Sequence, residues 1–145
     1  MTIDAMLLQA TADACTLSDG GLQAVHLAVS PHTIAQRHWP QGFPGSLQLE
    51  RAIDDVEIAI ERAGLLHAER GLLRVDAGLS ALMPSTLQGP ATFGRDAVEA
   101  AFSQLVAASD QVGHAGAAPG DGAAALLLVR ELMHHLGFPA LATGG

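Results

Sequence analysis

The stretch Ser46–Gly64, SLQLERAIDDVEIAIERAG, carries the clearest periodic pattern in this chain. Its apolar residues recur at i, i+4, i+7 and i+11, the spacing of one helix face, and they are Leu49, Ile53, Val56 and Ile60. Ser46 can cap the amino end with its hydroxyl, and Gly64 can end the helix in a left-handed turn. The sequence therefore predicts a helix over 46–64 with a buried apolar face.

A second stripe of this predicted helix is acidic. Its carboxylates share the same spacing and belong to Glu50, Asp54, Glu57 and Glu61. Like charges at this spacing repel one another, and within the helix only Arg51 lies near one of them. Such an edge can be solvated, can receive arginines from this chain or another, or can hold a cation. We interpret these four residues as a partner-binding edge.

Composition favours helices elsewhere in the chain. The hydrophobic share of 49% consists largely of Ala and Leu, aromatic residues make up 3%, and Tyr is absent. Since Ala and Leu have the highest helix propensities, the expected fold is mainly α, a small helical bundle-like single domain over 1–145 with a frayed tail at 140–145. The alternative is an α+β fold with a short sheet from 22–29 and 72–76.

Three further segments have patterns that decide between these folds. Thr2–Cys15 has apolar residues at helical spacing and is interpreted as a helix, whereas Leu22–Val29 fits a strand and a helix equally well. Leu65–Met83 is interpreted as a second helix, with a short strand over Leu72–Asp76 as the competing interpretation.

The carboxyl-terminal half contains two clearer helices. Arg95–Ser109 is amphipathic, with Arg95 placed to pair with Glu99. A last helix is predicted from Asp121, as its cap, to Leu136, because Gly137 and Pro139 follow in the usual order for a helix end.

The net charge of −8 excludes several classes of partner. Seven arginines and no lysine cannot supply the basic surface that nucleic acid or an anionic membrane requires. The amino-terminal residues lack the basic region of a signal peptide, and no apolar run is long enough to span a bilayer, so a cytoplasmic location is expected. Cys15 is the only cysteine, and we interpret it as a small buried apolar residue.

Two groups of residues that include histidines are candidate metal ligands. Glu131 and His134 have the Glu-x-x-His spacing of di-iron carboxylate bundles, but the motif is specific only when repeated, and it occurs once; Glu131 can instead pair with His135. The other three are spaced six residues apart, which matches no regular zinc-binding pattern, and they are His26, His32 and His38. The sequence therefore predicts neither a metal site nor a cofactor.

Motifs of known catalytic machinery are also missing from the sequence. It has no G-x-S-x-G elbow, no G-x-G-x-x-G and no Walker-type loop, so it identifies no catalytic residue. The prediction is a small acidic cytoplasmic interaction or accessory protein, whose partner is a second copy of this chain or a basic protein. The alternative is a metal-dependent enzyme of the helical carboxylate and histidine type, built on the 46–64 helix with Glu131 and His134.

Overall fold

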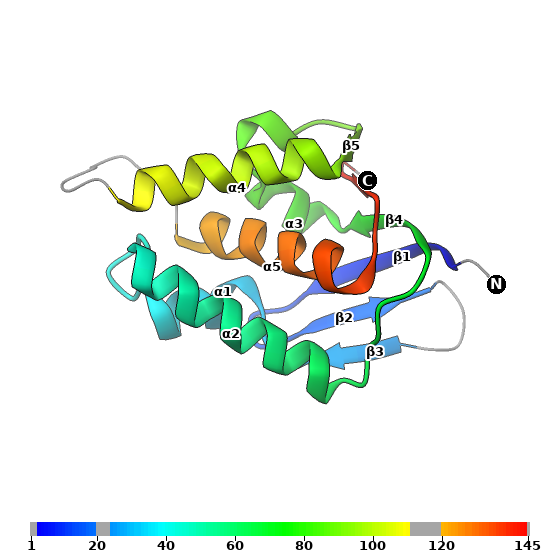
Figure 1. The fold of residues 1–145 in the computed structure, drawn as a ribbon, viewed down its shortest axis with the longest axis horizontal. Helices are drawn as coiled ribbons and strands as arrows, with labels where there is room; N and C mark the ends of the chain where they lie inside the picture. Colours follow the sequence, from blue (N-terminus) through cyan, green and yellow to red (C-terminus); the bar gives the residue numbers. More distant parts are fainter. Residues whose placement is uncertain (1–2, 20–23, 111–119, 145) are drawn as a thin grey trace.

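The described strands form one mixed six-stranded β-sheet, against which the helices lie (Figure 1). The computed structural model describes residues 3–19, 24–110 and 120–144. The strands, in chain order, are β1 (Ile3–Ala10), β2 (Cys15–Ser18), β3 (Ala24–Leu27), β4 (Arg70–Val75), β5 (Thr92–Gly94) and β6 (Ala140–Ala142). Side by side, they lie in the order β3-β2-β1-β4-β6-β5.

The sheet combines parallel and antiparallel pairs. β1, β2 and β3 form an antiparallel meander. In β2, Cys15 and Leu17 are buried in the core, whereas Thr16 and Ser18 lie on the opposite face and are half-buried. β4 runs parallel to both β1 and β6, and β5 is antiparallel to β6 and is the last strand of the sheet. The carboxyl ends of β1, β3, β4 and β6 therefore meet at one edge of the sheet.

Five α-helices and one short 3-10 helix accompany the sheet in the described part of the chain. They are α1 (Pro31–His38), α2 (Ser46–Arg62), α3 (Ala77–Leu82), η1 (Ser85–Leu87), α4 (Arg95–Ser109) and α5 (Gly120–Leu136). Figure 1 shows α5 between α2 and α4, and it also contacts α1 and α3. Because helices surround it, α5 is buried along its whole apolar run, residues 122–129.

The predicted mainly α bundle is wrong, and so are two of its helices. The segment predicted as a helix over Thr2–Cys15 contains β1, and the segment Leu65–Met83 is divided into β4 and α3. The α+β alternative came closer, because β3 lies within 22–29, of which residues 22 and 23 are outside the described part, and β4 overlaps 72–76. Helix propensity is a weak local preference, and pairing of β1 with both β2 and β4 outweighs it.

Three predicted helices are confirmed. α4 has the predicted bounds, α5 ends at Leu136 before Gly137, and α2 buries Leu49, Val56 and Ile60 while Ile53 packs at the margin of the core. The cap of α2 differs from the prediction. Gly45 occupies the cap position, and the Ser46 hydroxyl instead donates a hydrogen bond to Asp110 Oδ1 at 2.6 Å.

The carboxyl-terminal segment also differs from the expectation that 140–145 is a frayed tail. Residues 140–142 form β6, with Leu141 fully buried, and the Thr143 hydroxyl donates a hydrogen bond to the Gly89 carbonyl oxygen. A strand of three residues has little pattern of its own, and its pairing with β4 and β5 decides its structure. Among the described residues, no helix is both long and apolar enough to cross a membrane.

Candidate functional site

The carboxyl edge of the sheet gathers polar side chains from separate parts of the chain. In open α/β sheets, ligands bind outside the carboxyl ends of the strands. At this edge lie the turn between β1 and β2, the first turn of α1 and the first turn of α3. We define the carboxyl-edge site by Thr11, Asp13, Ser30 and Asp76.

Asp76 follows β4 and fixes the geometry of this edge. Its Oδ1 accepts a hydrogen bond from the Leu79 N–H at 2.8 Å and so caps α3, while Oδ2 accepts one from the Ala10 N–H at 3.3 Å. The Asp76 N–H in turn donates to the Leu8 carbonyl oxygen at 3.1 Å. The carboxylate is half-buried, so it is held in place and remains within reach of solvent.

The turn between β1 and β2 is closed by a threonine. The Thr11 N–H donates to the Ala14 carbonyl oxygen at 2.9 Å, and Thr11 Oγ1 accepts hydrogen bonds from the N–H groups of Asp13 and Ala14 at 3.3 and 3.2 Å. Ser30 caps α1 and donates from its hydroxyl to the Ala12 carbonyl oxygen at 2.7 Å, which ties the turn to that helix. Asp13 lies at the tip of this ordered turn and is exposed.

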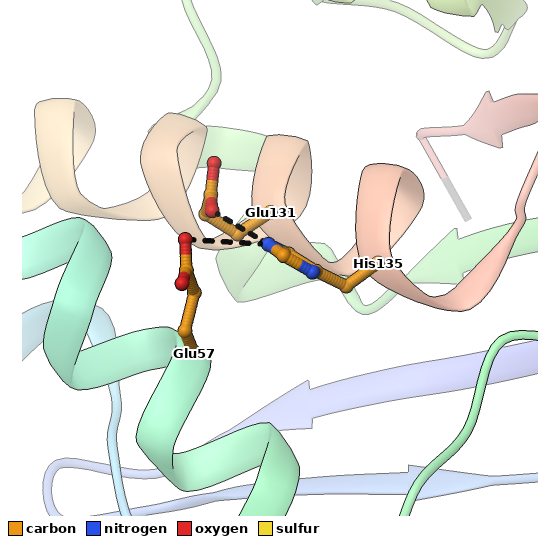
Figure 2. Close-up of side chains that lie close together, drawn as sticks. All are labelled: Glu57, Glu131 and His135. Carbon is orange, nitrogen blue, oxygen red and sulfur yellow. Dashed lines mark hydrogen bonds and ion pairs between the residues drawn. The ribbon is translucent and has the colours of Figure 1, made fainter.

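A second group of side chains lies between α2 and α5 (Figure 2). His135 Nε2 lies 3.2 Å from Glu131 Oε1 and 3.4 Å from Glu57 Oε1. The Glu131 side chain is only 1% exposed, and its Oε2 accepts a hydrogen bond from Arg130 Nη1 at 2.5 Å. Among the described residues, these three form the one group of His, Cys, Asp or Glu whose ligand atoms lie close enough for a shared metal ion. We call Glu57, Glu131 and His135 the interhelical cluster.

Arg130 links this cluster to α4. Its Nε donates to Glu99 Oε1 at 3.0 Å, and its guanidinium lies over the Phe102 ring, 4.8 Å from the centroid. Burial by itself lowers the pKa of Arg130, but hydrogen bonds to Glu99 and Glu131 outweigh it and raise that pKa above its ordinary value. Arg130 is therefore a permanent cation beside the cluster.

The two groups lie at opposite ends of α5. The amino end of α5 is beside α1, where the Trp39 Nε1–H donates to the Gly120 carbonyl oxygen at 2.9 Å. Its carboxyl end leads through Gly137 to the start of β6. The parallel strands begin on the side of the sheet opposite to the carboxyl-edge site. Figure 1 shows this direction of α5.

The acidic edge predicted from the sequence is divided by the fold. Glu50, Asp54 and Glu61 are exposed, and among the described residues the structure shows no ion pair to any of them. Only Glu57 reaches another element, through His135. Arg37 of α1 reaches α2 but pairs with Asp55, Nη1 to Oδ2 at 3.1 Å.

The structure does not bring the three spaced histidines together. Each has a different partner: His26 Nδ1 lies 3.3 Å from Thr16 Oγ1, His32 Nδ1 lies 3.7 Å from Asp121 Oδ2, and His38 Nε2 lies 2.5 Å from Asp55 Oδ2.

His134 is exposed and lines a shallow hollow with Arg95 and Glu99, and its ring meets that of His135 edge-on. Glu131 thus pairs with His135, the i+4 residue, and not with His134, which confirms the alternative pairing that the sequence offered. Both spacings put two residues on one helix face, and only the position of α2 distinguishes them.

Sequence reasoning singled out none of the four residues of the carboxyl-edge site. The available signal was the competing strand over 72–76, because an acidic residue directly after a parallel strand lies at the edge where ligands bind. Choosing a helix for Leu65–Met83 removed that signal.

Comparison with known proteins gives structural neighbours only. No protein-family model matches the chain, and no curated protein sequence matches it. An Aquifex aeolicus PPX-GPPA enzyme matches over 97% of this chain with a TM-score of 0.67 at 9% identity. An Aquifex aeolicus Ppx/GppA phosphatase, crystallised as a type II variant, matches over 97% with a TM-score of 0.69 at 7% identity. A protein described as exopolyphosphatase-like matches over 97% with a TM-score of 0.66 at 10% identity.

These neighbours correct the functional prediction. The chain has the fold of a part of Ppx/GppA phosphatases, and it covers 53%, 53% and 54% of the three structures, about half of each. The prediction of a helical interaction or accessory protein is therefore wrong, and the enzyme alternative fits the neighbours better. The helical bundle on which that alternative was built is absent from the fold.

Proposed function

We propose that this chain forms one half of an enzyme that releases phosphate from a polyphosphate, with the substrate bound at the carboxyl-edge site. The observation that carries the proposal is the agreement of the fold with phosphatases over 97% of the chain. The ordered turn at Thr11–Ala14 and the fixed carboxylate of Asp76 lie where sheets of this kind bind ligands. We also propose the cytoplasm as its location.

The chemistry of the edge suits a phosphate chain that carries a divalent cation. Asp13 and Asp76 would repel a bare phosphate, and Mg²⁺ is usually bound by one or two carboxylates together with substrate phosphates. Asp13 is exposed at the tip of the turn, so we assign it the role of orienting or deprotonating the attacking water. Asp76 would bind the divalent cation of the substrate complex, beside the carboxyl end of β1.

The length of the neighbours limits what this chain would do alone. Because the chain covers about half of each structural neighbour, it would supply one side of the substrate site. The other side would come from a second folded unit, for which a second copy of this chain is the simplest source. Binding of substrate to this half is therefore the property to measure first.

The test is binding of tripolyphosphate with Mg²⁺, followed by backbone NMR. We expect the amide signals of residues 11–14 and 76–79 to move, and the Asp76→Asn and Thr11→Val variants to bind about tenfold more weakly, as loss of one charged or hydrogen-bonded contact implies. Asp54→Asn and Thr86→Val are matched controls, because both residues are exposed and lie outside the site. Signals that move elsewhere, or equal weakening by the controls, contradict the proposal.

A further inference from the structure

We propose that the interhelical cluster of Glu57, Glu131 and His135 is a binding site for a divalent first-row metal ion, with Zn²⁺ as the reference ion. The ion would connect the carboxyl-terminal halves of α2 and α5. This inference does not depend on the phosphatase proposal, because the cluster and the carboxyl-edge site are at opposite ends of α5.

The separations within the cluster fit a shared ion. Two ligands at about 2.1 Å from a tetrahedral ion lie about 3.4 Å apart. His135 Nε2 is 3.2 Å from Glu131 Oε1 and 3.4 Å from Glu57 Oε1, and all three ligand atoms lie within 4.8 Å of one another. A charge-assisted N–H···O bond is shorter, about 2.7–2.9 Å. One imidazole N–H shared between two carboxylates would make two weak bonds, whereas an ion satisfies all three groups.

The charges around the cluster also favour a cation. Arg130, a permanent cation, pairs with the carboxylates of Glu99 and Glu131, and Glu57 adds a third carboxylate that contacts His135. The net charge is therefore −2 when His135 is neutral. A buried carboxylate needs full compensation, and Glu131 is 1% exposed. A divalent ion bound to the neutral imidazole of His135 brings the net charge of the group to zero.

The protein would supply three ligands to the ion, and water would supply the fourth. The Glu57 side chain is 44% exposed and that of His135 35%, so solvent reaches the side of the cluster opposite to Glu131. Imidazole nitrogen and carboxylate oxygen are common ligands of zinc, and sites with three protein ligands keep an open position for water. Arg130 holds the other oxygen of Glu131 and orients the carboxylate toward His135.

The test is calorimetric titration of Zn²⁺ into the metal-free full chain. We expect one equivalent to bind, and the Glu57→Gln and His135→Gln variants to bind at least about tenfold more weakly. The chain offers matched controls: Glu50→Gln removes a carboxylate of the same helix, and His134→Gln removes the neighbouring imidazole, and both should bind like the parent chain.

Replacement of Zn²⁺ by Co²⁺ gives a second readout, since a four-coordinate ion with nitrogen and oxygen ligands has visible absorption bands that the His135→Gln variant should lose. Both varied side chains are partly exposed, so the variants should fold, and circular dichroism checks this. The absence of a stoichiometric binding event overturns the proposal, as does equal weakening by His134→Gln.

Discussion

Asp76, at the end of β4, accepts a hydrogen bond from the backbone N–H of Ala10, 66 residues earlier in the chain, at the end of β1. The same carboxylate caps α3 through the Leu79 N–H. One side chain therefore joins two parallel strands and a helix at the edge where we place the substrate. This relationship makes Asp76 both a structural residue and a candidate ligand, and two different variants separate these roles.

Asp76→Ala removes the helix cap and should lower the free energy of unfolding by about 1–2 kcal/mol. Asp76→Asn keeps a capping oxygen and should lower it by less, while still weakening binding of the magnesium complex of tripolyphosphate. Urea unfolding measures the first effect and calorimetric titration the second. Asp54→Ala, at an exposed position of α2, should leave both unchanged. If Asp76→Ala unfolds at the same urea concentration as that control, the assigned cap is wrong.

Two glycines with positive φ should respond differently to the same substitution. Gly64 has φ +76° and Gly137 has φ +89°, so alanine is strained at both. A Cβ at Gly64 would have no atom within 4 Å, whereas one at Gly137 would overlap the Ala68 carbonyl oxygen.

We expect Gly64→Ala to cost about 1 kcal/mol and Gly137→Ala to cost more, up to about 3 kcal/mol in total. Thermal and urea unfolding of the two variants give the comparison. Equal losses would show that the close approach of Gly137 to the Ala68 carbonyl oxygen does not constrain the end of α5.

Arg70 is buried, and its guanidinium is held by carbonyl groups. Its Nε donates to the Leu136 carbonyl oxygen and its Nη2 to that of Leu66, both at 2.7 Å, and burial lowers the pKa of Arg70 from its ordinary value. Lysine cannot reach both oxygens with one ammonium group, so Arg70→Lys should cost about 1–3 kcal/mol in urea unfolding. Arg74→Lys is the control, because Arg74 is exposed on the same strand and should tolerate the change.

Cys15 should be unreactive while the protein is folded. Burial, followed by the charge of Asp76, raises the pKa of the Cys15 thiol from 9.0 to about 12. We expect a thiol reagent at pH 8 to modify Cys15 only when urea unfolds the chain. Rapid modification of the native protein would contradict its buried position.

The same shift of the Cys15 pKa predicts a direction for alkaline pH. Below pH 9 both states hold the proton, and between pH 9 and pH 12 only the folded state keeps it. The free energy of unfolding should therefore fall by up to about 1.4 kcal/mol per pH unit in that range. Cys15→Ala should lack this component, and the difference between the two curves measures it.

The sequence by itself determined α2, α4 and the end of α5. In each, the apolar period and the stop signal lie within one stretch of chain, so residues 46–62 or 95–109 contain all the information that the helix needs. It also predicted the burial of Cys15, which the structure confirms.

Only the tertiary structure decided the sheet and the two groups of side chains for which we propose functions. β1 has the Ala, Leu and Met composition of a helix, and it is a strand because β2 and β4 supply its hydrogen bonds, the latter from more than 60 residues away. Glu57 and Glu131 stood out in the sequence on separate helices. The packing of α2 against α5 brought them to His135 and left His134 outside, because side-chain spacing defines a helix face but not the neighbour which that face meets.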